Sequence, residues 1–478
     1  MAKGLQMAKD ERSTTGPSRA ARALPVVAAL VCALALSGCG TGGGPAGSSS
    51  PGGAATTSGV ATSRPASASS RLSPSATATS TPTARVTTTA PPASVPTATR
   101  PATTATPPPA TTTADRATWT STAAPTSAAK PSSAGLSATL VPYTGVVENL
   151  FFHPVIAYPE VAFNGNPKTQ GLDEYMVTVP EYDAMLASLY AKNYILVDWN
   201  DVWSEKVGAD GHAAMAANTL MLPPGKKPLV LNFDDVNYYQ YMRDTGFTFK
   251  LIVGDDGNLW SWGLDPQGKV VISQDLDAIT ILDKFVRAHP DFSLNGAKGC
   301  LNLTGYEGIL GYRTQTSTTD TSAAAAAYRQ SQINAVKPVI AKLKKTGWTF
   351  ASHTWGHIDL AHASLDAVKA DCDRWQAEVG SLIGPTRIFV YPYGARLDGG
   401  DAWSTGPALQ YVQSLGFRVF ASVGDESFSR IKPDLDAVVC DRMHADGITL
   451  RHDRDRYLKF YDAKLVFDNR RPDYGTDW

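Results

Sequence analysis

The chain has 478 residues and a formal net charge of −1, and its composition changes abruptly along its length. Residues 1–38 carry five basic and two acidic residues (+3) and residues 39–138 carry six and one (+5), which leaves residues 139–478 at −9. A domain this acidic lacks the basic face that a nucleic-acid partner requires, so none is expected. The same domain alone has the aromatic and aliphatic content for a large core.

The first 38 residues are typical of an export signal. Arg19 and Arg22 precede the apolar run 23–36, which is too short to span a bilayer. The run ends in Leu36-Ser37-Gly38-Cys39, which resembles the lipobox of bacterial lipoproteins, where the cysteine is lipidated and becomes the first mature residue. We therefore expect Cys39 to anchor the protein to a membrane. A plain secretory signal with an incidental cysteine is the alternative.

Residues 39–138 consist almost entirely of Ala, Ser, Thr, Pro and Gly, and Trp119 is their only aromatic residue. Such a segment cannot bury enough apolar surface to offset the entropy lost on ordering, so we expect a disordered tether. A single catalytic domain is expected over 139–478.

Within that domain, apolar runs typical of strands alternate with segments of helical periodicity. Strands are expected at 150–154, 194–197, 228–233, 348–351, 387–391 and 417–423, and helices at 180–190, 321–345, 365–383 and 408–415. Asp320 is the expected N-cap of the long helix that begins at 321. Alternation of this kind predicts parallel strands, with functional residues at their carboxyl ends. The stretch 246–319 is rich in Gly, Asp, Asn and aromatics, whose rings would either lie on loops, where they could stack on a ligand, or pack as a loop cover over the domain.

Two pairs of chemically active residues fall at predicted strand ends. Asp234 and Asp235 end one apolar run, and His353 and His357 follow another. The four-residue spacing predicts that both imidazoles lie on one face of a helical turn, where they could chelate one ion. A divalent ion held by one carboxylate and two imidazoles keeps open positions for water and substrate, and the second carboxylate could act as general base.

Three motifs in order now give a specific resemblance. Asn232-Phe233-Asp234-Asp235, His353-x-x-x-His357 and Tyr391-Pro392-Tyr393-Gly394 resemble the motifs of the polysaccharide deacetylase family, the NodB-homology domain. The segments 151–154 and 194–197 are similar to the subgroup nearest to poly-N-acetylglucosamine deacetylases. The resemblance covers roughly residues 139–468.

The resemblance implies an α/β fold, a distorted (β/α) barrel of about seven strands. It also implies metal-dependent removal of N- or O-linked acetyl groups from a cell-wall or extracellular polysaccharide. Asp234 would be the base, and Asp235, His353 and His357 the ligands of a divalent ion, with zinc the expected metal. Cobalt, nickel or manganese would also bind such ligands.

The third motif would contribute to substrate binding. Pro392, Tyr393 and Gly394 would line the groove, and the backbone N–H of Tyr393 is a candidate oxyanion donor. The family's arginine two positions before the proline is Val390 here, so the base would need another partner, for which Arg387 and Arg396 are candidates. The family's late acidic histidine has two candidates. We favour His452, in Leu450-Arg451-His452, over His444, which follows an apolar run.

Only Cys300, Cys372 and Cys440 lie in the globular part, and their spacing fits no zinc ribbon. One disulfide with a free thiol and three buried thiols are the two open possibilities.

Two classes of function therefore compete. The first is an envelope-anchored carbohydrate deacetylase, and the second is a non-catalytic carbohydrate-binding lipoprotein that keeps the fold. The complete base-and-ligand set favours the enzyme. A metal-capturing lipoprotein is a third reading, but the chain has few clustered ligands for it. The sequence determines neither the sugar nor the oligomeric state.

Overall fold

The structure, a computed structural model, describes residues 139–209, 211, 213–397, 403 and 405–478. The predicted export signal, Cys39 and the tether lie outside these residues. Within the described ranges, no helix is long and apolar enough to cross a membrane.

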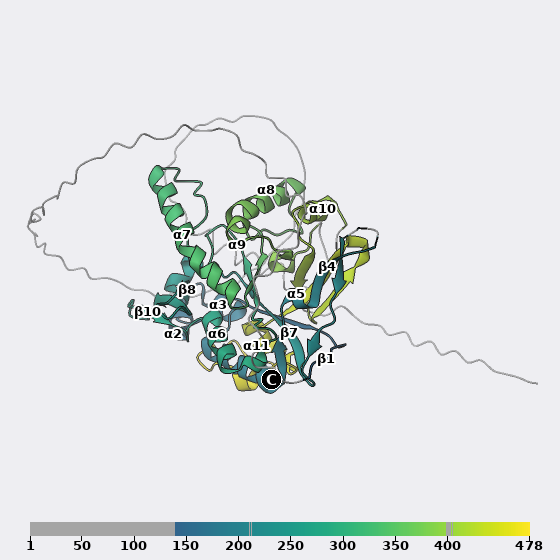
Figure 1. The fold of residues 1–478 in the computed structure, drawn as a ribbon. Coiled ribbons are helices and arrows are strands. Elements are labelled where there is room, and N and C mark those ends of the chain that lie inside the picture. Colours follow the sequence, from purple (N-terminus) through teal and green to yellow (C-terminus); the bar gives the residue numbers. More distant parts are fainter. Residues whose placement is uncertain (1–138, 210, 212, 398–402, 404) are drawn as a thin grey trace, which may run out of the picture. The chain divides into compact units, whose positions relative to one another are not determined.

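A closed barrel of seven parallel strands occupies the centre of the domain (Figure 1). The ring runs from β7 through β11, β12, β13, β14, β16 and β2 back to β7. This confirms the predicted (β/α) barrel of about seven strands. The ring strands are β2 (Glu148–Phe152), β7 (Lys227–Asp234), β11 (Cys300–Leu303), β12 (Thr349–Ser352), β13 (Ile388–Val390), β14 (Val419–Val423) and β16 (Ala437–His444).

Alternate residues of the ring strands form two separate cores, because successive side chains of a strand point to opposite faces. Leu229, Leu231 and Phe233 of β7 belong to the larger core, which includes the apolar faces of the surrounding helices. Val230 belongs to the smaller core, whose other ring members are mainly small or β-branched: Cys300, Ala351, Ile388, Val390, Val419, Ala421, Val438 and Cys440. Side chains of this size fill the narrow inside of the barrel.

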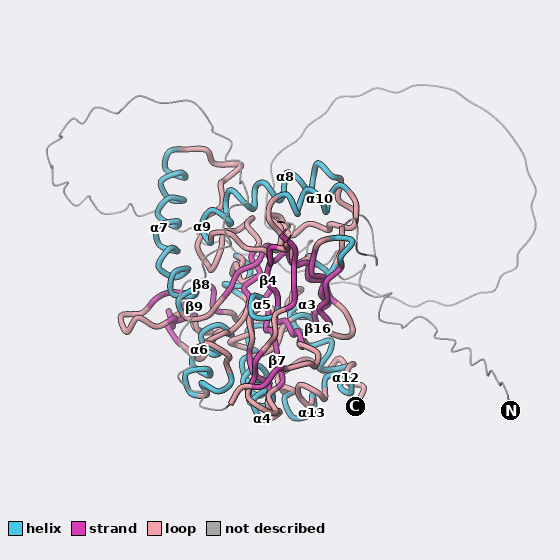
Figure 2. Tube along the Cα trace, turned by 45° about the vertical axis from the view of Figure 1, so that its right-hand side comes forward, coloured by secondary structure: helices cyan, strands magenta, loops and turns pink. Residues whose placement is uncertain are grey.

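The helices surround the strands, as Figure 2 shows with the strands in magenta at the centre. Helix α7 starts two residues later than predicted, because Ser322 rather than Asp320 accepts a hydrogen bond from the first turn, at Ala325 N. The helices are α2 (Pro159–Ala162), α3 (Thr169–Tyr175), α4 (Val179–Ala191), α5 (Trp199–Val202), α6 (Ala278–Ala288), α7 (Ala323–Lys345), α8 (Leu365–Trp375), α9 (Ser381–Ile383), α10 (Pro407–Ser414), α11 (Gly447–His452), α12 (Arg454–Tyr457) and α13 (Ala463–Val466).

One sequence prediction about the sheet is confirmed and another needs correction. The predicted strand at 194–197 exists as β3 (Tyr194–Leu196), but it pairs with β7 outside the ring. The stretch 246–319 is not mainly loop, since it holds an antiparallel sheet, a helix and the ring strand β11. Its strands are short and mix polar with apolar residues, so they lack the continuous apolar run of β7. The sheet consists of β8 (Thr248–Val253), β9 (Leu259–Leu264) and β10 (Val270–Ser273).

Smaller elements complete the domain. Strand β15 extends the barrel as an antiparallel partner of β16, and two two-stranded sheets pair β1 with β6 and β4 with β5. These strands are β1 (Val141–Pro142), β4 (Trp203–Val207), β5 (Ala213–Ala217), β6 (Met221–Leu222) and β15 (Phe428–Lys432).

The three cysteines of the domain are all buried free thiols. Cys300 and Cys440 belong to the inner core of the barrel and Cys372 to the outer one. Burial raises the pKa of each thiol, so these cysteines act as small apolar side chains.

Candidate active site

The carboxyl ends of β7 and β12 bring together one carboxylate and two imidazoles. Asp235, His353 and His357 each offer a ligand atom, and these atoms all lie within 4.8 Å of one another. The Nε2 atom of His357 is 3.7 Å from Oδ2 of Asp235. Ligand atoms bound at about 2.0–2.2 Å to one ion lie about 3–4 Å apart, so this set fits a single divalent cation.

A backbone carbonyl orients His353. Its Nδ1 atom lies 3.0 Å from the carbonyl oxygen of Val390, so a proton on Nδ1 would leave Nε2 as the ligand atom. Burial is the main cause that lowers the pKa of His353, to about 4, and the ring is therefore neutral at physiological pH. Neutral imidazole is the form that binds metal ions.

His357 reaches the site on a loop, and the prediction of a helical turn between the two histidines is wrong. Thr354 and His357 both have positive φ angles, 58° and 52°, which no helix contains. The carboxylate of Asp371 accepts hydrogen bonds from the backbone N–H groups of Trp355 (2.6 Å) and Gly356 (2.7 Å) and so shapes the loop.

A tyrosine hydroxyl holds the carboxylate ligand. Asp235 has a φ angle of 58°, and its Oδ1 accepts a hydrogen bond of 2.5 Å from the Tyr239 hydroxyl. That hydroxyl is also 2.8 Å from Oγ1 of Thr304. Burial would raise the pKa of Asp235, but the neighbouring His357 and His353 outweigh it and lower the pKa. With Oδ1 engaged by Tyr239, Oδ2 is the oxygen that faces His357.

Asp234 is paired with an arginine from β16, which β2 separates from β7 in the ring. Arg442, at the end of β16, donates from Nη1 to Oδ1 (2.7 Å) and from Nη2 to Oδ2 (2.9 Å). Asn302 of β11 donates to Oδ1 as well, at 2.5 Å. Burial opposes ionisation of Asp234, but the charge of Arg442, followed by that of His353 in its protonated form at low pH, lowers the pKa of Asp234 well below the usual range. The carboxylate is therefore anionic and has a fixed orientation.

Neither arginine expected from the sequence fills this place. Arg387 pairs with Glu205 at 2.8 Å, and Arg396 with Asp441 at 2.7 Å. Position 390 contributes only a backbone carbonyl, and the arginine comes from another strand.

The Pro392–Gly394 turn lies beside the candidate ligands. The ring of Tyr393 packs edge-on against His357, with centroids 4.4 Å apart, and Tyr393 has a φ angle of 59°. Gly394 also has a positive φ, 68°, and an added Cβ would lie 3.0 Å from Cβ of Val423. The turn therefore needs glycine here, and backbone strain at Asp235, His357 and Tyr393 is concentrated at this one site.

Comparison with known families now adds to this geometry. Residues 318–420 match the family model described as polysaccharide deacetylase. The matched stretch begins just before α7 and includes β12, β13 and the start of β14. The match includes His353, His357 and the Pro392–Gly394 turn, and it supports an enzyme of the carbohydrate esterase or deacetylase class, as the resemblance implied.

Two solved structures resemble the chain more distantly. The Streptococcus pyogenes deacetylase PplD in complex with acetate is 16% identical and covers 64% of this chain and 94% of its own, with a TM-score of 0.35. IcaB from Ammonifex degensii is 15% identical and covers 63% and 92%, with a TM-score of 0.33. No curated protein matches the chain. The assignment rests on the family match.

The two histidines considered for the acid of the deacetylase lie in different surroundings. His452, at the end of α11, is 46% exposed and lies 2.9 Å from Asp477. It lines a depression of about 490 Å³ that includes none of the four residues of the two motif pairs. His444 ends β16, two residues after Arg442, and its ring lies 6.1 Å from that of Phe151. The structure brings His444, and not His452, to the barrel end that carries the site.

A buried carboxylate accompanies His444. Nδ1 of His444 is 2.6 Å from Oδ2 of Asp446. Burial would lower the pKa of His444, but Asp446 outweighs it and raises the pKa. His153, which follows β2, contributes to the lowered pKa of Asp234, Asp235 and Asp446, and its Nδ1 atom lies 3.0 Å from the Tyr175 carbonyl oxygen.

Sequence reasoning missed several residues of the deacetylase site. Arg442 had one detectable signal, because it lies on the same strand face as the apolar Val438 and Cys440, where a buried arginine needs a partner. Asn302 had none, since β11 was not recognised. Tyr239 follows Asp235 by four residues, but nothing in the sequence distinguishes it from Tyr238.

Proposed function

We propose that the protein is a metal-dependent hydrolase that removes N- or O-linked acetyl groups from a cell-wall or extracellular polysaccharide. The arrangement that carries this proposal is the anionic Asp234, held by Arg442, next to three candidate metal ligands. A module that only binds carbohydrate has no need of a buried, oriented carboxylate at that position. The enzyme is therefore favoured over the non-catalytic lipoprotein, whose main support was the missing motif arginine.

Asp235, His353 and His357 would hold the divalent ion, with zinc the first candidate for two imidazoles and a carboxylate. A bound ion would supply Lewis-acid polarisation and lower the pKa of water. Within this chain, Tyr239 fixes Asp235 and the Val390 carbonyl fixes His353, so both ligands are oriented before binding.

Asp234 would accept a proton from the water that attacks the acetyl carbonyl carbon. Arg442 and Asn302 hold its carboxylate in one orientation, and the attacking water must approach within hydrogen-bond reach of it. Negative charge then develops on the carbonyl oxygen. The backbone N–H of Tyr393 would stabilise that charge, while Pro392 and Gly394 line the substrate groove.

His444 is the proposed acid, in place of His452. It would donate a proton to the leaving sugar nitrogen or oxygen as the bond to the acetyl carbon breaks, which releases acetate. Asp446 raises the pKa of His444 and orients its ring, whereas His452 lies on an exposed surface beside Asp477.

We further propose the arrangement of the whole chain. Residues 1–38 would be a lipoprotein signal, Cys39 the lipidated anchor and 39–138 a tether to the catalytic domain 139–478. This would hold the enzyme at the outer side of a membrane, facing the cell wall.

Acetate release is the test of this function. The purified, metal-loaded protein should release acetate from at least one of chito-oligosaccharides, peptidoglycan or acetylated xylan, and the Asp234→Asn variant should not. No acetate above that variant on any of the three polymers would refute the enzyme and leave the binding lipoprotein. The sugar that responds also decides between N- and O-deacetylation.

A further inference from the structure

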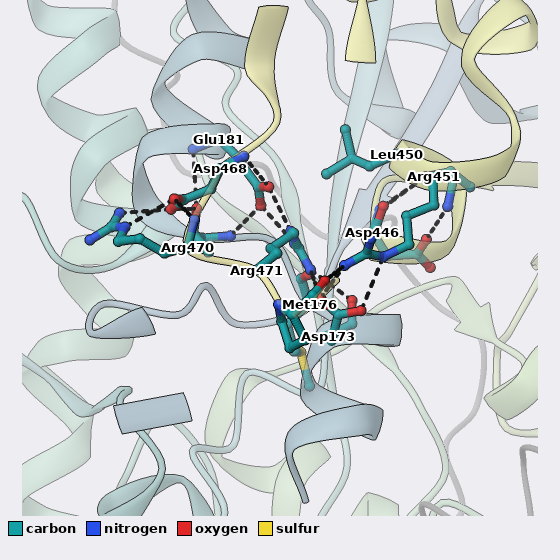
Figure 3. Close-up of polar contacts among 12 residues, drawn as sticks. Asp173, Met176, Glu181, Asp446, Leu450, Arg451, Asp468, Arg470 and Arg471 are labelled. Carbon is teal, nitrogen blue, oxygen red and sulfur yellow. Dashed lines mark hydrogen bonds and ion pairs between the residues drawn. The ribbon is translucent and has the colours of Figure 1, made fainter. Parts of the chain in front are cut away.

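A buried cluster of charged residues ties the C-terminal segment to the barrel end that carries His444 (Figure 3). Its centre consists of Asp173 of α3, Glu181 of α4, Arg451 of α11 and Arg471 of the final segment. Their side chains are 1%, 0%, 5% and 0% exposed. We call these four residues the clasp.

Arg471 uses every donor of its guanidinium in the clasp. It donates to both carboxylate oxygens of Glu181 (2.6 and 2.7 Å), to Oδ1 of Asp173 (2.9 Å), and to the backbone carbonyls of Asp173 (2.8 Å) and Met176 (2.7 Å). Five donors in a rigid fork with five acceptors define one position for the segment.

Arg451 connects the same carboxylate to α11. Its Nη2 and Nε atoms donate to Asp173 (3.0 and 3.2 Å), and it also donates to the carbonyls of Pro472 (2.7 Å) and Gly475 (3.1 Å). Helix α11 is thus held between α3 and the final segment. Buried charges that satisfy one another like this contribute little net stability but specify one arrangement, because removing one partner is costly.

The contact between α11 and α3 is also very close. A Cβ atom on Gly447, the first residue of α11, would lie 1.7 Å from the Asp173 carbonyl oxygen and 2.7 Å from Nη1 of Arg471. Only glycine permits this approach. The residue before it is Asp446, the N-cap of α11, whose Oδ1 accepts from Thr449 N and whose Oδ2 lies against His444.

We propose that the clasp is a positioning device for His444. It fixes the start of α11, and with it the Asp446 carboxylate that orients the His444 ring, so residues 468–478 act at the active site through α11 without touching it. This inference rests on the proposed function for the role of His444. The metal ligands lie on β7 and the loop after β12, which have no part in the clasp.

Arg471→Met tests this, with Arg470→Met as the matched control. Arg470 is the adjacent arginine and is 49% exposed, with both of its hydrogen-bonding nitrogens on Asp468. We expect kcat of Arg471→Met to fall at least tenfold while KM and zinc affinity stay within twofold of the parent. Arg470→Met should have the same kcat, KM and zinc affinity as the parent. Gly447→Ala, which displaces α11 sterically without removing a charge, should reproduce the effect.

A second readout separates this inference from the proposed function. The groups that act electrostatically on His444 are Asp446, Asp453 and Asp425, and Asp446 is the strongest. If the clasp positions Asp446, NMR titration of the His444 ring should give a lower pKa in Arg471→Met and Gly447→Ala, whether or not any glycan is hydrolysed. A changed titration without activity in the parent would refute the function and keep the inference.

Unchanged kcat and an unchanged His444 titration in folded Arg471→Met would overturn the inference. If that variant does not fold, Arg471→Lys keeps the buried charge but loses the fork, and the same comparison applies to it. Equal loss of zinc affinity and kcat would also overturn it, because the clasp would then support the fold as a whole.

Discussion

Arg442 holds both carboxylate oxygens of Asp234, and it does so from a strand that is not adjacent to β7 in the barrel. The deacetylase resemblance places an arginine at position 390, where this chain has valine. The backbone carbonyl of Val390 instead pairs with Nδ1 of His353, and Arg442 of β16 is the arginine that binds Asp234. Asp234, the proposed base, is thus held by an arginine although that arginine comes from a different position in the chain.

The Arg442–Asp234 pair gives a prediction about stability. Arg442→Met leaves a buried carboxylate without its counter-charge, so we expect the free energy of unfolding to fall by about 3–5 kcal/mol and acetate release to be lost. Urea unfolding of the purified protein measures the first effect. Arg456→Met, which removes a partly exposed pair with Asp425, is the control and should change stability by less than about 1 kcal/mol. Equal stability of the two variants would contradict the role of Arg442.

Metal binding should depend on the paired histidines. We expect the His353→Ala, His357→Ala double variant to lose bound zinc, since a single carboxylate ligand remains. Zinc content after dialysis, and affinity from competition with a chelator, are the measurements. His362→Ala, whose side chain is 84% exposed, should bind like the parent. Undiminished zinc in the double variant would refute the ligand assignment.

The Tyr239 hydroxyl should affect metal affinity without touching the ion. Tyr239→Phe removes the hydrogen bond to Oδ1 of Asp235, and we expect zinc affinity to fall about tenfold, at the lower end of the range for groups that orient ligands. Tyr238→Phe is the control, because that hydroxyl donates to Asp277 instead. Equal affinities of the two variants would show that Asp235 needs no such support.

The pH dependence of the reaction should report on Asp446. This carboxylate raises the pKa of His444 against the opposing effect of burial, so His444 keeps its proton to higher pH. Asp446→Asn removes the charge, the pKa of His444 falls, and the basic limb of kcat/KM should move to lower pH. Asp473→Asn, on the exposed final segment, should leave the limb in place. A basic limb that does not move in Asp446→Asn would exclude His444 as the acid.

The sequence was informative where one physical pattern dominated. The apolar run before Asp234 predicted β7, and the alternation of strands with helices predicted parallel strands with Asp234 and His353 at their carboxyl ends, whereas the barrel was implied by the family resemblance. Both predictions are confirmed by the fold. Strand β11 was missed because Cys300-Leu301-Asn302-Leu303 is short and alternates polar with apolar residues, so its neighbours, and not its own composition, make it a strand.

Contacts between distant segments could not be read from the sequence. Arg442 and Asp234 are 208 positions apart, and local patterns contain no information on which arginine meets which carboxylate. For the same reason the local match Leu450-Arg451-His452 led the sequence analysis to favour His452 over His444. Arg451 donates a hydrogen bond to Asp173, and the His452 side chain is 46% exposed.

The closed ring has a consequence for the order in which the protein gains its properties as it folds. The three candidate ligands follow β7 and β12, and both of these strands pair with β11. Arg442, the partner of Asp234, lies on β16, which closes the ring by pairing with β14 and β2. Pairings this remote in sequence form late, because loop closure is entropically slow. A folding chain can therefore bring its three candidate metal ligands together first, and Asp234 gains its partner Arg442 only in the step that seals the barrel.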